Sequence, residues 1–121
     1  MLLDSNIIIY SFLAQYKQLL QAFVNNHNTC CSAISCVETL GYHKLSNDEL
    51  YYLQRYFNTT SVLPVTQAII DAAVELRQQR KISLGDAVIA ATALVHNQTL
   101  VTRNVKDFDW VDGLKVVNPF A

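Results

Sequence analysis

Four carboxylates occupy positions from which the folded chain could bring them together. Asp4 follows an apolar pair near the first residue, Glu38 follows a β-like stretch over 29–33, and Asp86 heads a long apolar run. Asp107 comes shortly after another β-like stretch. If these side chains converge, their oxygens form the kind of ligand set that holds a divalent metal ion.

The same acids also fit helix capping. Asp4 lies at a strand-to-helix junction, where an acid can cap the incoming helix. Three pairs have the spacing of a capping box: Ser35 and Glu38, Ser83 and Asp86, and Asn104 and Asp107. Taken singly, each acid is explained more simply as a cap than as a catalytic group. The segment 46–49 has the same spacing but follows no strand, so we expect it to be a cap alone.

Strand-like and helix-like segments alternate along the chain. Short strands are predicted over 2–4, 29–33, 61–65, 99–102 and 115–118. Apolar residues at helical spacing predict helices over 5–13, 15–26, 35–45, 48–58, 66–80 and 84–97. This alternation predicts a layered α/β domain with parallel strands.

The carboxyl ends of parallel strands lie on one edge of a sheet, which is where open α/β sheets bind ligands. Asp4, Glu38 and Asp107 follow strand ends, and Asp86 joins them if its helix begins at that edge. Clustered carboxylates repel one another and lose hydration, so a bare cluster is costly. A divalent cation removes this cost, and hard oxygen ligands select Mg²⁺ or Mn²⁺, which also bind phosphate oxygens. The pattern therefore indicates phosphate-ester chemistry.

Length and composition limit the class of protein. The chain has 121 residues, which fits one domain, and its 51% hydrophobic and 16% charged residues are not those of a disordered chain. A net charge of −1 excludes a strongly basic nucleic-acid binder but permits local basic patches. No apolar run approaches the roughly 20 residues that span a bilayer, and the first residues lack a signal peptide. We therefore expect a cytoplasmic protein without a membrane partner.

The acid-bearing segments resemble, in order, the motifs of PIN domains. Leu3-Asp4-Ser5-Asn6-Ile7 resembles their LDTN opening, and 35–38 with Leu40 resembles their second acidic motif. Residues 83–93 (SLGDAVIAATA) are similar to the third motif, and 100–108 (LVTRNVKDF) to the fourth. The ending GLKVVNP over 113–119 resembles that of VapC-type toxins.

The resemblance implies a PIN-like three-layer α/β/α fold, in which a central, mostly parallel sheet has four or five short strands. It implies a single PIN domain over 1–121. It also implies a Mg²⁺- or Mn²⁺-dependent endoribonuclease that hydrolyses RNA phosphodiester bonds as the toxin of a type II toxin–antitoxin pair. Asp4, Glu38 and Asp86 match the three best-defined acids of the family.

The fourth acid is where this sequence departs from the family pattern. Many relatives have Asp where this chain has Asn104, and others have an acid at the position of Asp107; we favour Asp107. The resemblance then implies four catalytic residues: Asp4, Glu38, Asp86 and Asp107. Of these, Asp4, Asp86 and Asp107 are expected to ligate the metal, while Glu38 ligates it or orients its waters.

Polar and basic residues beside the acids are expected to support them. Asn6 and Thr102 match polar positions of the family, where they would orient carboxylates or bind a phosphate, or serve ordinary hydrogen bonding. Asn104 can ligate through its amide oxygen, without charge. Basic residues that could contact the RNA backbone, or be solvated, flank the acids: Arg80, Lys81, Arg103 and Lys106.

Large apolar side chains crowd the first two predicted helices and the helix over 48–58. They are either core residues or, in part, a surface that faces a partner. The resemblance implies two partners, a second copy of the chain in a homodimer and a VapB-like antitoxin whose tail lies between these helices.

Other functions stay open from the sequence. A receiver-like signalling domain is a poor fit, because it needs an acid after the third strand and 61–65 offers none. A PIN nuclease of RNA processing that lacks an antitoxin fits the same fold. So does a catalytically silent PIN-like binding module, although retention of Asp4, Glu38 and Asp86 argues against it.

Overall fold

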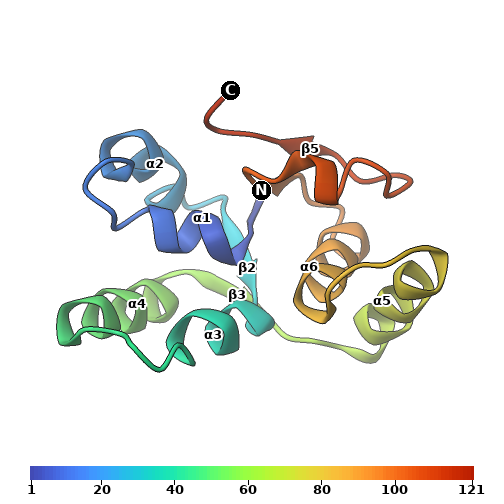
Figure 1. Cartoon of the computed structure of the whole chain (residues 1–121), viewed down its shortest axis with the longest axis horizontal. Coiled ribbons are helices and arrows are strands. Elements are labelled where there is room, and N and C mark those ends of the chain that lie inside the picture. Colours follow the sequence, from blue (N-terminus) through green and yellow to red (C-terminus); the bar gives the residue numbers. More distant parts are fainter.

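A parallel sheet of short strands forms the centre of the computed structural model, which describes all residues from Met1 to Ala121 (Figure 1). Its five strands lie in the order β3-β2-β1-β4-β5, and every neighbouring pair is parallel. The strands are β1 (Leu2–Leu3), β2 (Cys30–Ser32), β3 (Ser61–Leu63), β4 (Leu100–Val101) and β5 (Val116–Val117). The predicted α/β class, with a central sheet of four or five short parallel strands, is confirmed.

Six α-helices and one short 3-10 helix connect the strands. They are α1 (Ser5–Tyr10), α2 (Lys17–Val24), α3 (Ala33–Leu40), α4 (Asn47–Thr59), α5 (Gln67–Gln79), α6 (Leu84–Val95) and the 3-10 helix η1 (Val105–Asp107). All six helices were predicted, but α1, α2 and α3 are shorter than expected. Ser11 ends α1, where its hydroxyl donates to the carbonyl of Ile8 at 2.6 Å. Such local side-chain bonds compete with helix continuation.

The sheet separates two hydrophobic cores, which gives the expected three layers. Helices α5 and α6 lie on one side of the sheet, and α1, α2 and α4 lie on the other (Figure 1). Leu2 of β1 faces the first core, and the next residue, Leu3, faces the second. Their partners on β2 and β4 face the same way, because the register pairs Leu2 with Cys30 and Leu100. A shift of one residue would exchange the two faces, so burial on both sides fixes the register.

Helix α6 is buried around most of its circumference. All residues from Ala87 to Ala93 are buried, four of them alanines. Small side chains let α6 pack closely against α5 and the sheet. The N-terminus of α6 is thereby fixed relative to the strand ends, and with it the position of Asp86.

The cap predicted at Ser35 is wrong. Helix α3 begins directly after β2, and its N-cap is Ser32, whose hydroxyl accepts from the backbone N–H of Ile34 at 3.2 Å. Ser35 lies inside the helix and is fully buried, so Ser35 and Glu38 do not form a capping box. The strand runs into the helix without a loop, so the hydroxyl at the strand end takes the cap position. Glu38 is left free for other contacts.

Of the other predicted caps, those at Ser46, Asp4 and Ser83 are present and the one at Asn104 is not. Ser46 and Glu49 form a reciprocal capping box, with bonds of 3.1 and 2.9 Å. Asp4 caps α1. The Ser83 hydroxyl accepts from the backbone N–H of Asp86 at 3.2 Å. The side chain of Asn104 makes no cap bond to η1.

None of the helices has both the length and the apolar character needed to cross a bilayer.

Phe108 anchors the segment that carries Asp107 to the α5–α6 core, where it is 1% exposed. We predict that Phe108→Ala lowers the free energy of unfolding by about 3–5 kcal/mol, because it removes a buried aromatic ring and leaves a cavity. Urea denaturation followed by circular dichroism measures the change. As the matched control, Tyr51→Ala truncates an aromatic ring that is 64% exposed and should change stability by about 0.5 kcal/mol or less. Equal urea midpoints for Phe108→Ala and the wild type would contradict this role.

Candidate metal centre at the carboxyl edge of the sheet

Asp4 follows β1 directly and is buried, with 4% of its surface exposed. Its carboxylate accepts from the backbone N–H of Ile7 at 2.9 Å, so one oxygen caps α1. Its backbone N–H donates to the carbonyl of Val101 in β4 at 3.1 Å. The strand ladder and the cap together fix this carboxylate at the edge of the sheet, between the ends of β1 and β4.

Glu38 reaches the same region from α3. The hydroxyl of Ser5 donates to its Oε1 at 2.7 Å and lies 2.8 Å from the hydroxyl of Ser35. Gly85, in the first turn of α6, makes room for the carboxylate. A β-carbon at position 85 would overlap Oε2 of Glu38 and lie 2.8 Å from its Cδ. Glu38 is therefore held between the first turns of α1 and α6.

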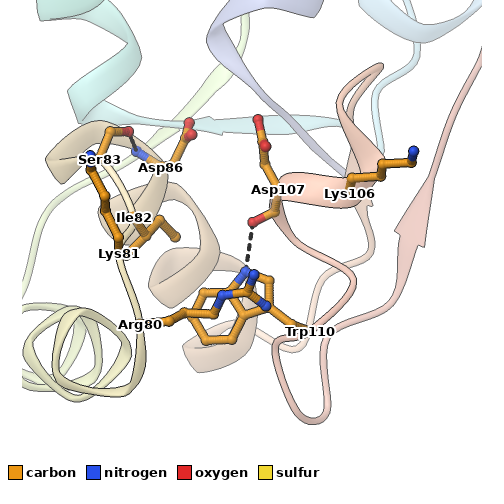
Figure 2. Close-up of a pocket in the computed structure, with 8 residues that line it drawn as sticks. All are labelled: Arg80, Lys81, Ile82, Ser83, Asp86, Lys106, Asp107 and Trp110. Carbon is orange, nitrogen blue, oxygen red and sulfur yellow. Dashed lines mark hydrogen bonds between the residues drawn. The ribbon is translucent and has the colours of Figure 1, made fainter.

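Asp86 and Asp107 line a second part of the site, a cleft of about 310 Å³. Figure 2 shows their carboxylates pointing in the same direction, on either side of the space between α6 and η1. The Ser83 hydroxyl bonds the backbone N–H of Asp86. Because the serine takes the cap position, the half-buried Asp86 carboxylate points into the cleft.

The electrostatic shifts show that these acids influence one another. Burial raises the pKa of Asp4, and hydrogen bonds from Thr102 and Ile7 lower it in part, while the charges of Asp86 and Glu38 raise it further. Burial also raises the pKa of Asp86; Ser83 opposes the shift, and the charges of Asp107 and Glu38 add to it. No basic side chain contributes to either shift. The structure thus brings Asp4, Glu38, Asp86 and Asp107 into one electrostatic group that lacks an internal counter-charge.

The raised pKa of Asp4 has a consequence for stability. Folding favours the protonated carboxyl, because the pKa is higher in the folded chain than in the unfolded chain. The stability contributed by this group is fully present below the unfolded pKa and is lost as the pH rises through the folded pKa. Ionising Asp4 in the folded chain therefore costs stability, and a positive charge at the site would offset that cost.

The residues fit a hard divalent cation by chemistry, although they do not enclose one. No three acidic, histidine or cysteine side chains stand close enough to hold a metal ion as they are placed. The donors are nevertheless carboxylate oxygens, which Mg²⁺ and Mn²⁺ prefer, and they carry uncompensated charge. A cation of this type would supply the missing counter-charge.

The polar residues expected to assist the acids take different positions. Thr102 is fully buried, hydrogen-bonds the Asp4 carboxylate and accepts from the backbone N–H of Asn104 at 3.1 Å. Asn6 and Asn104 are exposed, and Asn104 is not among the residues that line the cleft with Asp107. This difference favours Asp107 over Asn104 as the fourth acid.

The Arg103 side chain lies against an aromatic cluster and does not line the cleft. Its guanidinium carbon is 4.5 Å from the ring centre of Phe120 and 5.3 Å from that of Tyr16, whose hydroxyl accepts from Nη1 at 3.1 Å. Tyr10 lies 5.6 Å away. These contacts tie the C-terminal segment to α1 and the loop before α2.

Sequence reasoning missed three residues that position Glu38. Ser5 and Ser35 form the hydroxyl pair beside its carboxylate, and Gly85 provides the space that it occupies. The spacing of Ser35 and Glu38 predicts a cap instead. A glycine in the first turn of a predicted buried helix is the one signal that could have been used, since glycine there is unfavourable unless another group approaches closely.

We predict that the pKa of Asp4 in the folded chain is above the ordinary value of 3.8. We also predict that Asp86→Asn lowers this raised pKa. The substitution removes one like charge but leaves Asp4 buried, so the pKa should still exceed the ordinary one. Carbon-13 NMR of the carboxyl groups in metal-free buffer measures it. Asp71→Asn, which removes an exposed carboxylate from α5, is the control and should leave the Asp4 titration unchanged. An Asp4 pKa at or below 3.8 would contradict the electrostatic description.

Comparison with known proteins identifies relatives along the chain. The family described as "PIN domain" matches residues 1–114. Ribonuclease VapC1 of Rickettsia felis is 46% identical over 41 residues, a match that covers 34% of this chain and only 31% of that relative.

Solved structures match over a much larger share. A toxin–antitoxin complex from Klebsiella pneumoniae is 35% identical, with a TM-score of 0.76, over 98% of this chain and 96% of that chain. VapBC-1 from nontypeable Haemophilus influenzae is 25% identical, with a TM-score of 0.80, over 99% of this chain and 98% of that chain. FitAcB from Neisseria gonorrhoeae is 25% identical, with a TM-score of 0.77, over 98% of this chain and 97% of that chain. The match over 1–114 and the similarity to the Klebsiella complex agree with the strand order and the acid-lined edge, and the chain belongs to the PIN-domain family.

Proposed function

We propose that this chain is a divalent-metal-dependent endoribonuclease and the toxin of a type II toxin–antitoxin pair, formed as a single PIN domain over 1–121 and acting in the cytoplasm. The observation that carries the nuclease proposal is the group of four acids, within which burial and like charge raise the pKa of Asp4 and of Asp86 without a contribution from any basic side chain. Such a cluster is suited to a cation and to the phosphate oxygens that a cation attracts.

The proposed catalytic residues are Asp4, Glu38, Asp86 and Asp107. Asp4, Asp86 and Asp107 would hold Mg²⁺ or Mn²⁺, which would polarise the scissile phosphate and lower the pKa of a bound water. Glu38, fixed by the Ser5 hydroxyl, would ligate the cation or orient a water beside it.

The surrounding residues support the acids. Thr102 donates to Asp4 and so holds its carboxylate toward the site. Asn6 and Asn104 are exposed near the acids and would contact substrate phosphate or water. Arg103, which was expected to bind substrate, has its guanidinium in the aromatic cluster, so its proposed contribution is to hold the C-terminal segment.

An antitoxin partner is supported by the solved complexes named above, which contain a toxin with its antitoxin. A mainly hydrophobic groove of about 270 Å³ lies between α1, α3 and α4, and Glu38 is among the residues that line it. We propose that a VapB-like antitoxin segment binds there, with its apolar side chains against Ile9, Phe12 and Leu45. Most large side chains of α1 and α2 are wholly or partly buried in the core, and the groove between α1, α3 and α4 is an apolar surface that stays accessible.

We also propose that the chain forms a homodimer. Light scattering of the purified chain measures its mass in solution and tests this.

The alternative function is a PIN nuclease of RNA processing without an antitoxin. If the product of a neighbouring gene co-purifies with the chain and inhibits RNA cleavage, the toxin function is supported. If no such product inhibits the cleavage, the alternative function is supported.

We predict that the purified chain cleaves RNA when Mg²⁺ or Mn²⁺ is present and that EDTA abolishes the cleavage. Asp4→Asn and Asp86→Asn should each lower the rate by about a hundredfold or more, because each removes a charged ligand from the proposed metal site. Denaturing gels of structured RNAs measure the rate, and Asp71→Asn is the control for loss of a surface carboxylate. Equal cleavage by the wild type and both site variants would refute the enzyme, and a wild type that binds RNA without cutting it would indicate a silent module.

We further predict that Gly85→Ala lowers cleavage by about tenfold or more without lowering stability. The added methyl group displaces the Glu38 carboxylate, whereas replacing a helical glycine by alanine stabilises the helix by up to about 1 kcal/mol. Cleavage assays and urea denaturation measure the two effects separately. If the methyl group acts through Glu38, adding Gly85→Ala to Glu38→Gln causes no further loss of activity. Full activity of Gly85→Ala would show that the position of Glu38 does not matter.

A further inference from the structure

The cleft that contains Asp86 and Asp107 also has a basic wall. Arg80 and Lys81, from the segment between α5 and α6, line it together with Trp110. Figure 2 shows Arg80 lying over the Trp110 ring, below the two carboxylates, while the Lys106 ammonium extends away from them. The acids and the arginine thus belong to one hollow of about 310 Å³.

Arg80 is exposed, yet one residue restricts its position. Its guanidinium carbon lies 4.9 Å from the centre of the Trp110 ring, a cation–π contact. Trp110 is itself half-buried, and its Nε1 donates to the backbone carbonyl of Asp107 at 2.9 Å. The same indole therefore contacts the residue that carries one acid and the arginine on the basic wall.

The Arg80 charge is not used to neutralise the neighbouring acids. No hydrogen bond or ion pair joins Arg80 to Asp86 or Asp107, although all three residues line the cleft. A guanidinium that lies over a ring face keeps its N–H groups, which point outward in its own plane, available to another acceptor. Planar, bidentate N–H donors of this kind match the oxygens of a phosphate.

We propose that Arg80, positioned by Trp110, binds a backbone phosphate of the RNA strand beside the four acids, with Lys81 as an additional positive charge. This inference rests on the proposed ribonuclease function. It specifies that the RNA strand runs along the side of the site formed by Arg80 and Lys81. The acids repel a phosphodiester that approaches without a cation, and a fixed cation at the rim offsets that repulsion where the strand enters. Trp110 is a positioning residue, since it acts through Arg80.

Binding of a fluorescein-labelled, mixed-sequence single-stranded RNA in EDTA buffer, where cleavage cannot proceed, tests the proposal. Fluorescence anisotropy over a series of salt concentrations gives both the affinity and its salt dependence. Arg80→Gln should weaken binding about fivefold to tenfold and make the slope of log K against log salt shallower by about 0.7, the value for one phosphate contact with a single strand. Arg80→Lys keeps the charge but loses the planar donors, so its affinity for the RNA should lie between that of the wild type and that of Arg80→Gln.

The matched control is Arg55→Gln, which removes an exposed arginine from α4, outside this cleft. It should leave affinity and slope unchanged. Trp110→Leu should weaken binding as Arg80→Gln does, and the double variant Arg80→Gln/Trp110→Leu should bind no more weakly than Arg80→Gln alone. A purely structural role of Trp110 would instead weaken the double variant further. Thermal unfolding verifies that each variant is folded.

The outcomes separate this inference from the function on which it rests. If the wild type cleaves RNA in an acid-dependent manner but Arg80→Gln binds RNA with unchanged affinity and slope, the subsite is wrong and the nuclease stands. If Arg80→Gln weakens binding only of a polyglutamate peptide, the basic wall recognises an acidic protein segment and the inference is overturned. If the wild type neither binds nor cleaves RNA, both proposals fail.

Discussion

The carboxyl group of Asp4 is removed from water at the end of β1, and no basic side chain is there to offset a negative charge on it. The strand pairing and the α1 cap hold it there, while Glu38 and Asp86 add like charge. A fold retains such a cost only where surrounding packing enforces it, which is typical of functional sites. The chemistry proposed for this chain depends on that uncompensated charge, because it creates the demand for a cation.

The architecture explains how so small a chain keeps the acids in place. Side chains alternate between two cores along β1, β2 and β4, so burial on both faces fixes the register of these strands and the level at which each ends. The alanine-rich α6 packs tightly between α5 and the sheet and presents Asp86 at the same edge. Phe108 is buried next to Asp107 and secures the fourth acid in the same way. Rigid elements thus carry each carboxylate, with short polar contacts from Ser5 and Thr102 for fine orientation.

Charge is divided within the site between the acids and a separate basic wall. Arg80 lies over Trp110, while Arg103 lies among Tyr10, Tyr16 and Phe120. Both arginines lie close in sequence to one of the four acids, and the sequence alone gives both the same expectation, contact with the RNA backbone or solvation. Their surroundings assign them different tasks, since one guanidinium faces the cleft and the other joins the C-terminal segment to α1. The hydrophobic groove beside Glu38 gives the site a third wall, where a bound partner could reach the acids.

The sequence by itself determined the alternation of strands and helices, the parallel sheet and the identity of the acids, because hydrophobic period and strand-end placement are local properties. It did not determine the start of α3, the roles of Ser5 and Gly85, or the different surroundings of Arg80 and Arg103. These depend on contacts between residues far apart in the chain, such as Ser5 with Glu38 and Arg103 with Tyr16. Only tertiary packing decides which hydroxyl reaches which carboxylate and which ring covers which cation, since neither spacing nor propensity encodes the distance between separate elements.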